Sequence, residues 1–201
     1  MPPAPLEFWY EFASPYSYIA AMRIDATSQK HGVDVHWRPF LLGPVFRRLG
    51  FEDSPFNEQP LKRDYMWRDV QRCCECEGLP FVRPKPFPGH SLNAARVALL
   101  GLKKGWGVEF SKAVYDAHFG QGKNLTDAGL LKTLSAEVSG EDGEQIWSEA
   151  MGPDNKAQLR SQTEHASNLG VFGAPTFIRN GELFWGNDRL ELALTHSPKQ
   201  I

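Results

Sequence analysis

The first forty residues change their hydrophobic period twice, and this change constrains the fold more than any other feature of the sequence. Large apolar side chains alternate along residues 6–12, which predicts an interior strand that is mostly apolar on both faces. After Ser14-Pro15 the spacing becomes helical to about Lys30, and residues 33–37 alternate again as a second strand. This order of elements predicts a βαβ unit.

The junction between the first strand and the helix has the residues of a helix start. Ser14 suits the N-cap position, where a side-chain oxygen accepts a free backbone N–H, and Pro15 suits the first helical position. We expect the helix to end before Gly32. A second serine, Ser17, follows one turn after the cap, so that two hydroxyls lie close to one helix tip.

Residues 41–152 have a different pattern, which predicts an all-helical block. Gly43-Pro44 interrupts the chain at its start. Helical spacing then recurs in five stretches, which are residues 61–77, 91–104, 108–118, 127–139 and 143–150. Thr126 is the expected N-cap of the fourth stretch, and a loop with four prolines at 78–90 separates the first two.

The C-terminal part returns to a mixed pattern. A further helix begins at Pro153, and two apolar runs follow that are separated by Asn180-Gly181. Asn-Gly between apolar runs is the strongest short signal for a β-hairpin. Either Asn187 or Asp188 is expected to cap a last helix.

This order of elements is that of a thioredoxin-like fold, of the α/β class, with an all-helical domain inserted after the first βαβ unit. The predicted domains are a discontinuous thioredoxin-like domain, residues 1–40 and 153–201, and an inserted helical domain, residues 41–152. In that fold a redox motif Cys-x-x-Cys lies where the first strand meets the first helix. This chain has SPYS at 14–17, so hydroxyls stand in place of both thiols.

Charge and composition limit the partners that we expect. With 201 residues and a formal net charge of −2, the chain has no basic field that would attract nucleic acid or an anionic membrane. It has neither a run of about 18 apolar residues nor a signal-peptide pattern, so we expect a soluble cytoplasmic protein. Its cysteines, Cys73, Cys74 and Cys76, are too close together for a disulfide framework, and the sequence has no cluster of metal ligands. We therefore expect a small-molecule or protein partner.

Four segments together resemble one enzyme family. They are EFASPYSY at 11–18, KRDYMWRD at 62–69, GVFGAPTF at 170–177 and FWGNDRLE at 184–191. With these segments in order over nearly the whole chain, the sequence resembles the 2-hydroxychromene-2-carboxylate isomerases and, more distantly, the kappa-class glutathione transferases, both of the DsbA-like group. The resemblance implies a thioredoxin-like fold, glutathione as the cofactor and an aromatic acid as the substrate.

The resemblance also implies a site for the thiol of glutathione. Ser14 would hold the sulfur as a thiolate, because a helix N-terminus and a hydroxyl donor both favour an anion and depress the pKa of a thiol. Unlike a cysteine, Ser14 cannot trap glutathione as a mixed disulfide. Ala174 and Pro175 match a cis-proline turn that faces this helix tip and offers the backbone groups of Ala174 to the cysteinyl unit.

Other residues match the positions that bind the two ends of the tripeptide. Asp188, with Asn187 beside it, matches the acidic position for the γ-glutamyl end, while Lys62 and Asn57 match residues for the remaining carboxylate. Tyr16 is a candidate substrate contact. Further candidate lining groups are Trp9, Trp67, Arg83, Lys85 and His90.

The implied reaction converts a cis aromatic acid resembling 2-hydroxychromene-2-carboxylate to a product of the trans-o-hydroxybenzylidenepyruvate type. Addition of the thiolate to the conjugated carbon makes the former double bond rotatable, and elimination restores the double bond with the new geometry. The cofactor thus supplies the nucleophile, and the protein orients the reactants.

Three other functions stay open at this point. A kappa-like glutathione transferase or peroxidase would use the same thiolate on a different electrophile. A thiol-disulfide oxidoreductase would use Cys73-x-x-Cys76, although this pair falls inside a helical pattern rather than at a strand-to-helix turn. A binding or chaperone module that has lost its redox cysteines is the non-enzymatic alternative. The sequence also leaves the oligomeric state open, a homodimer included.

Overall fold

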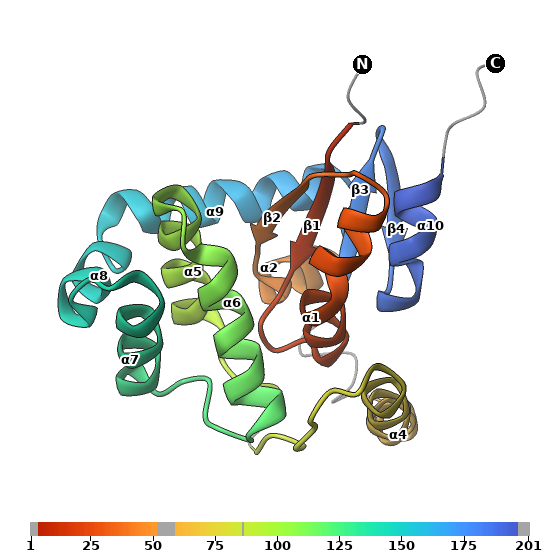
Figure 1. Ribbon diagram of the computed structural model, residues 1–201, viewed down its shortest axis with the longest axis horizontal. Helices are drawn as coiled ribbons and strands as arrows, with labels where there is room; N and C mark the ends of the chain where they lie inside the picture. Colours follow the sequence, from red (N-terminus) through yellow and green to blue (C-terminus); the bar gives the residue numbers. More distant parts are fainter. Residues whose placement is uncertain (1–3, 52–58, 86, 197–201) are drawn as a thin grey trace.

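A four-stranded mixed sheet forms the centre of the computed structural model, which describes residues 4–51, 59–85 and 87–196 (Figure 1). The strands, in chain order, are β1 (Leu6–Tyr10), β2 (Val35–Pro39), β3 (Thr176–Arg179) and β4 (Glu182–Trp185). Their order in the sheet is β2-β1-β3-β4, and β1 pairs in parallel with β2 and antiparallel with β3. The βαβ unit and the interior position of the first strand are therefore confirmed.

Helices pack on both faces of this sheet. They are α1 (Pro15–Lys30), α2 (Leu42–Arg48), α4 (Pro60–Glu77), α5 (Leu92–Lys104), α6 (Gly107–Tyr115), α7 (Ala128–Ser139), α8 (Gly143–Ala150), α9 (Pro153–Asn168) and α10 (Leu190–Thr195). A π-helical turn, η1 (Asp116–Gly120), continues α6, and a 3-10 turn, η2 (Asn187–Arg189), precedes α10. In Figure 1 the helices α5 to α8 form a group on one side of the sheet, and α4 lies away from them, next to α1.

Helix α1 begins and ends where the sequence predicts. The Ser14 hydroxyl oxygen accepts the N–H of Ser17 at 3.2 Å, and Pro15 is the first helical residue. At the other end Gly32 has a φ of 62°, a left-handed conformation that glycine adopts without a steric penalty. Local sequence alone therefore defines this helix, and its N-terminus comes directly after the turn that follows β1.

The hairpin of β3 and β4 is confirmed, but the expected cap of the last helix is wrong. Asn180 and Gly181 have φ values of 53° and 80°, which match the two central residues of a type I′ turn. Neither Asn187 nor Asp188 caps α10, because both lie in η2, and the N-cap position of α10 is Arg189 without a side-chain capping bond. The amide oxygen of Asn187 is instead bonded to a side chain of α1, as described below.

Two local details of the helical segment also differ from the sequence predictions. Gly43-Pro44 does not break the chain but lies in the first turn of α2, where a proline costs no hydrogen bond because the N–H groups there have no helical partner. The N-cap of α7 is Asp127 rather than Thr126. Its carboxylate accepts the N–H of Gly129 at 2.8 Å, while the Thr126 hydroxyl donates to a neighbouring asparagine.

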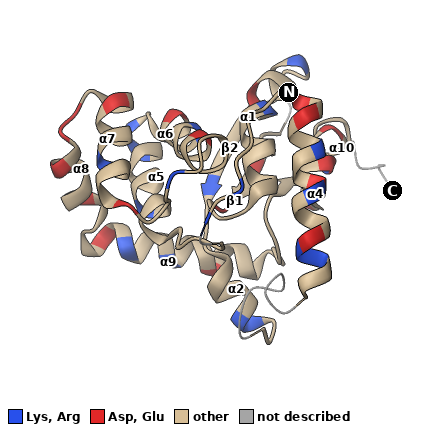
Figure 2. Cartoon of the chain, turned by 90° about the horizontal axis from the view of Figure 1, so that it is seen from below, with Lys and Arg blue, Asp and Glu red and all other residues tan. Residues whose placement is uncertain are grey.

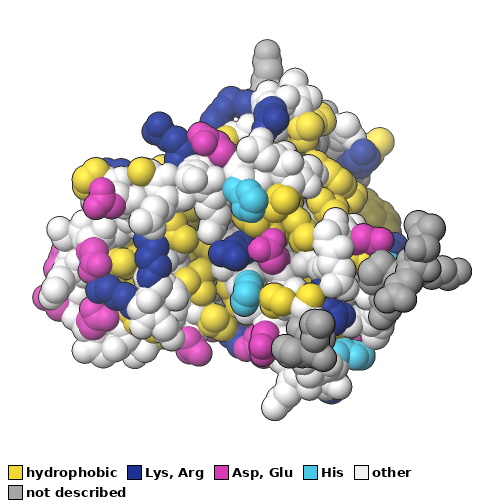
Figure 3. All heavy atoms as spheres, turned by 90° about the horizontal axis from the view of Figure 1, so that it is seen from above, with side chains coloured by type: hydrophobic (Ala, Val, Ile, Leu, Met, Phe, Trp, Pro, Cys, Tyr) yellow, Lys and Arg dark blue, Asp and Glu magenta, His cyan; other side chains and the backbone are white. Residues whose placement is uncertain are grey.

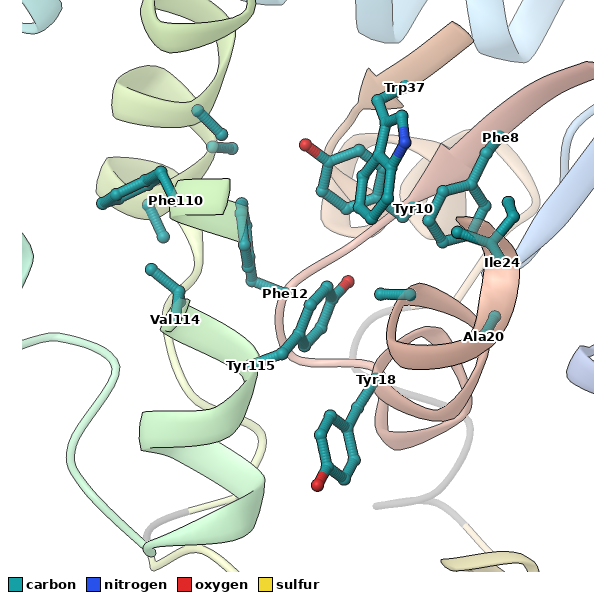
Figure 4. Close-up of a cluster of buried hydrophobic side chains, with 14 of the residues drawn as sticks. Phe8, Tyr10, Phe12, Tyr18, Ala20, Ile24, Trp37, Phe110, Val114 and Tyr115 are labelled. Atoms are coloured by element: carbon teal, nitrogen blue, oxygen red, sulfur yellow. The ribbon is translucent and has the colours of Figure 1, made fainter. Parts of the chain in front are cut away.

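Aromatic side chains from several strands and helices form the core on one face of the sheet (Figure 4). Phe8 and Tyr10 of β1 stack with ring centroids 5.1 Å apart, and Phe12 lies 5.1 Å from Tyr115 of α6. The Tyr10 hydroxyl is 2.8 Å from that of Ser111, so the buried phenol keeps a hydrogen-bond partner. Sheet and helical segment share this core. The division into domains at residues 41 and 152 stays a prediction.

The distribution of charge on the surface and the character of the helices both concern the partners that the sequence analysis expects. On the face seen in Figure 3, basic and acidic side chains are interspersed among apolar ones. Within the described residues, no helix combines the length and the apolar character that a membrane span requires.

Candidate functional site

The N-terminal tip of α1 meets the loop that precedes β3, as the sequence analysis expects. The Ser14 hydroxyl donates to the backbone oxygen of Ala174 at 2.8 Å while its oxygen accepts the N–H of Ser17. Ser14 is 7% exposed, and Ala174 is half-buried. The Ala174–Pro175 peptide bond is cis. One hydroxyl at a helix N-terminus therefore contacts the backbone of a cis-proline loop from the other end of the chain.

The two serines of the SPYS segment have different surroundings. Ser17 is completely buried, and its hydroxyl lies beside the phenol of Tyr115 in the aromatic core. Ser14 faces the loop at Ala174. Of the two hydroxyls, that of Ser14 is therefore the one placed to contact a ligand, and Ser17 belongs to the core.

The loop before β3 is fastened to the end of β4. The N–H of Gly186 donates to the backbone oxygen of Pro175 at 3.0 Å. The indole of Trp185 lies so close to Gly173 that a Cβ there would be 2.4 Å from the indole nitrogen. Because any side chain at position 173 would displace the indole or the loop, this glycine is required for the close packing. The position of Ala174 next to Ser14 thus depends on contacts made by β4.

Helix α4, which carries acidic and basic residues along its length in Figure 2, lies next to α1. The Tyr16 hydroxyl donates to Asp69 at 2.7 Å. Eight residues further along α4, Glu77 is 3.3 Å from the Arg23 guanidinium. Lys62 lies seven residues before Asp69, which corresponds to about 10 Å along the helix axis. Lys62 is exposed, near the N-terminus of α4.

Arg23 of α1 holds η2 in place. Its guanidinium donates to the backbone oxygen of Asn187 at 2.8 Å and to the side-chain oxygen of Asn187 at 3.3 Å, and it is paired with Glu191 at 2.8 Å. Asp188 follows in η2, and its side chain is 70% exposed. Its carboxylate is close enough to α4 to act on the pKa of Cys73. The predicted residues Asn187 and Asp188 therefore lie at the junction of α1, α4 and η2.

The environment of α4 raises the pKa of two of its thiols, Cys73 and Cys74. Burial raises the pKa of Cys73, the carboxylates of Asp69 and Asp188 raise it further, and Arg23 lowers it in part. Burial raises the pKa of Cys74 to about 12. All three cysteines of α4 are free thiols inside a helix rather than at its N-terminus, which fits the sequence argument against a redox pair at Cys73-x-x-Cys76.

Burial also raises the pKa of Tyr16, and the carboxylate of Asp69, which accepts its hydroxyl proton, adds to this effect. Tyr16 is half-buried and lies two residues after Ser14. The phenol is therefore neutral in the physiological range. Its hydroxyl donates to Asp69, and the neutral phenol is not a base at this pH.

Beneath the turn that leads to Ser14 lies a carboxyl group that the sequence analysis did not single out. Glu11 is only 4% exposed, and its carboxylate accepts the N–H of Ala13 at 2.8 Å. Burial raises its pKa from 4.5 to about 7, and hydrogen bonds from Ser91 and from the N–H groups of Ala13 and Ser14 lower it in part. An ionisable group thus lies three residues before the site hydroxyl.

The structure places one candidate lining residue elsewhere. Trp9 is completely buried on the opposite face of the sheet from Phe8 and Tyr10, because side chains alternate along a strand. It borders a hollow of about 370 Å³ whose other lining residues are Arg38, Gln158, Ser161, Gln162 and His165. The suggestion that Trp9 lines the Ser14 site is therefore wrong.

The other candidate lining residues differ in how deeply they are buried. Trp67 is buried in α4, with Phe87 at 4.5 Å between ring centroids and the Arg83 guanidinium 4.9 Å above its ring. Lys85 and His90 are exposed in the proline-rich loop. Asn57 lies outside the described residues. The Arg83 guanidinium is thus held over the Trp67 ring.

Sequence reasoning missed three residues of the site: Glu11, Arg23 and Asp69. Glu11 could have been suspected, because it is an acidic residue between apolar neighbours directly before a helix cap. Arg23 and Asp69 carry no such signal, since each is a charged residue in a helical pattern and such residues usually face solvent. Their partners come from α1, α4 and η2, which only the fold brings together.

Comparison with known proteins agrees with this geometry. Residues 5–196 match the family model described as a DSBA-like thioredoxin domain. A 2-hydroxychromene-2-carboxylate isomerase of Pseudomonas putida is 28% identical over 92% of this chain and 90% of its own. The human glutathione S-transferase kappa 1 is 22% identical over 94% of this chain and 89% of its own. A solved 2-hydroxychromene-2-carboxylate isomerase structure superposes with a TM-score of 0.84 and 26% identity, covering 93% of this chain and 91% of the other.

The chain therefore belongs to the DSBA-like thioredoxin domain family. The thioredoxin-like fold and the resemblance to the isomerases, both stated from the sequence, are confirmed. The enzyme class predicted from the sequence, an isomerase, is that of the 2-hydroxychromene-2-carboxylate isomerases among its relatives.

Proposed function

We propose that this protein is a glutathione-dependent isomerase that converts aromatic acids resembling 2-hydroxychromene-2-carboxylate to products of the trans-o-hydroxybenzylidenepyruvate type. The named isomerases that match over nine-tenths of the chain support this activity. The observation that carries the proposal is the contact of the Ser14 hydroxyl with the backbone oxygen of Ala174 at 2.8 Å. It defines a point where a thiol can meet a hydroxyl, a helix N-terminus and an accessible backbone at once.

The residues present fit glutathione. Along α4 the eleven residues from Lys62 to Cys73 correspond to about 16 Å, with Asp188 near the Cys73 end. Three extended residues span about 10 Å, and the lysine side chain covers the rest. Lys62 would pair with the glycine carboxylate, and Asp188 with the ammonium of the γ-glutamyl end. The cysteinyl unit would then lie at Ser14 and Ala174.

When bound, glutathione supplies a thiolate for reversible addition to the conjugated carbon of the substrate. Ser14 would donate its single hydroxyl proton to the sulfur instead of to Ala174, and the N-terminal end of α1 would favour the negative charge. Ala174 would hold the cysteinyl backbone. Tyr16, fixed by Asp69, would form the wall against which the aromatic acid is oriented.

The test is a rate assay with catalytic glutathione and the Ser14→Ala variant. Loss of a hydrogen-bond donor to developing negative charge typically costs about a hundredfold in turnover, so we expect a decrease of that size. Ser17→Ala is the matched control, because its hydroxyl lies in the core, and it should keep the wild-type rate within a few-fold. A Ser14→Ala enzyme with the wild-type rate would remove Ser14 from the mechanism.

A kappa-like glutathione transferase or peroxidase is the second candidate, and the relation to the human kappa enzyme favours it. Both activities need the same thiolate, so the products distinguish them. A glutathione adduct that accumulates with time would support the transferase. An isomerised acid with unchanged total glutathione supports the isomerase.

We also propose a cytoplasmic location, which the three free thiols of α4 favour.

The division into a thioredoxin-like domain and an inserted helical domain is likewise a proposal, which limited proteolysis near residues 41 and 152 would test.

A further inference from the structure

We propose that Glu11 accepts the proton that the glutathione thiol gives up on binding at Ser14, so that the cofactor is held as a thiolate while its proton stays in the protein. Glu11 would act as a positioning and proton-holding residue and would not touch the substrate. The inference rests on the proposed function, because it requires glutathione in the site.

The turn between β1 and α1 places this carboxyl group. The backbone oxygen of Glu11 accepts the N–H of Ser14 at 3.0 Å, and its side-chain carboxylate accepts the N–H of Ala13 at 2.8 Å. Main chain and side chain of one residue therefore both fix the turn that ends at the site hydroxyl. Glu11 lies three residues before Ser14, where the sulfur of glutathione would bind. Its side chain is buried, so its charge lies inside the protein rather than in solvent.

No basic side chain balances this charge among the described contacts of Glu11. The side chains that interact with Glu11 are Ser91, from the segment before α5, and Tyr115, from α6. Burial raises the pKa of Tyr115, so its phenol stays neutral near pH 7. Glu11 is thus the group in this set whose charge changes in the neutral range, and burial, which disfavours its anion, is the reason.

A second negative charge near Glu11 favours its protonated form still more. When the S–H bond of glutathione breaks, the electron pair stays on the sulfur. The proton forms an O–H bond on the Glu11 carboxylate, directly or through solvent. Charge and protons balance without any further reactant, and the protein then holds one buried negative charge instead of two.

The proposal predicts how many protons leave the protein on binding. At about pH 6 Glu11 is already protonated, so the thiol proton must be released; at about pH 8 Glu11 begins as the anion and retains it. Net release per site should therefore decrease from about one proton towards zero over this range. Calorimetric titration with glutathione in two buffers of different ionisation enthalpy measures this number directly.

Glu11→Gln is the decisive variant, because the amide keeps an oxygen for the Ala13 N–H but cannot take a proton at neutral pH. We expect it to release about one proton per site at about pH 7, where the wild type releases about half. Glu7→Gln is the matched control, since Glu7 lies four residues before Glu11, in β1, but is paired with Arg38 at 3.4 Å, and it should behave as the wild type does.

A second variant keeps the proposal testable if Glu11→Gln does not fold. Ser91→Ala removes a hydrogen bond that lowers the pKa of Glu11 and should shift the decrease in proton release to higher pH. Equal proton release by wild type and Glu11→Gln, with glutathione still bound, would overturn the role of Glu11 and leave the isomerase proposal intact. Failure of the wild type to bind glutathione would overturn both.

Discussion

The tip of α1 and the C-terminal end of α4 offer opposite environments for sulfur chemistry. The tip of α1 has no cysteine, yet a hydroxyl, a helix N-terminus and a cis-proline loop converge there. Helix α4 has three free thiols, but burial and neighbouring carboxylates raise the pKa of Cys73 and Cys74. The contrast supports the proposal that placement, rather than the presence of a cysteine, decides where a thiolate is stabilised.

The largest expected effect concerns the buried carboxyl at the tip of α1. A carboxyl whose pKa is raised in the folded protein contributes stability while it is protonated. For Glu11 this contribution to stability is complete below about pH 4.5, and it is lost as the pH rises through about 7. A shift of this size corresponds to ~3 kcal/mol in the free energy of unfolding.

Urea unfolding between about pH 4.5 and 8 measures this effect as the difference between the wild type and Glu11→Gln. The wild type should lose stability relative to the variant as the pH rises. A constant difference over this range would mean that Glu11 does not titrate near neutral pH. Glu7→Gln again serves as the control, because the Glu7 side chain is only half-buried and is paired with Arg38.

A smaller effect is expected at the loop that faces the α1 tip. In Gly173→Ala the new methyl group would overlap the Trp185 indole, so the loop or the indole must move. Overpacking of this kind typically costs about 1–3 kcal/mol. Because Ala174 moves with the loop, the affinity for glutathione should also decrease, by about tenfold or more for a loss of this size.

Thermal unfolding and calorimetric titration with glutathione check the Gly173→Ala prediction. The control is Gly43→Ala in α2, where the nearest atom to the new Cβ is an arginine side chain 3.8 Å away. This control should be neutral or slightly stabilising, because alanine favours a helix over glycine. A Gly173→Ala variant with unchanged affinity would show that the loop does not position the cofactor.

The smallest effect is expected for the thiols of α4. Replacing Cys73 and Cys76 by serine should leave turnover within about twofold, since surface and half-buried substitutions of this kind change little. Cys74 is kept because it is buried in the core. Loss of most of the activity in the double variant would contradict the comparison above and restore the dithiol interpretation.

Local patterns predicted those parts of the molecule that local interactions determine. The cap at Ser14, the end of α1 at Gly32 and the turn at Asn180-Gly181 each depend on a few neighbouring residues. The misplaced cap at Thr126 shows the limit, because Asp127 next to it is an equally good capping residue by type.

The parts of the site that come from distant segments could not be predicted in this way. Arg23 is bonded to η2 across more than 160 positions of sequence, and nothing near Arg23 indicates that partner. The resemblance to a known family supplied Ala174, Asp188 and Lys62. The wrong position of Trp9 was avoidable, since strand alternation already places it on the face opposite Phe8 and Tyr10.

The central claim is that an external thiol is held as a thiolate at Ser14. The most direct measurement is the ultraviolet absorbance of the thiolate when glutathione is added at about pH 7 to the variant lacking Cys73 and Cys76, with and without Ser14→Ala. The account predicts an increase approaching one thiolate per protein, most of which Ser14→Ala removes and Ser17→Ala does not. Glutathione that binds but remains a thiol, or a thiolate signal that is the same without the Ser14 hydroxyl, would contradict it.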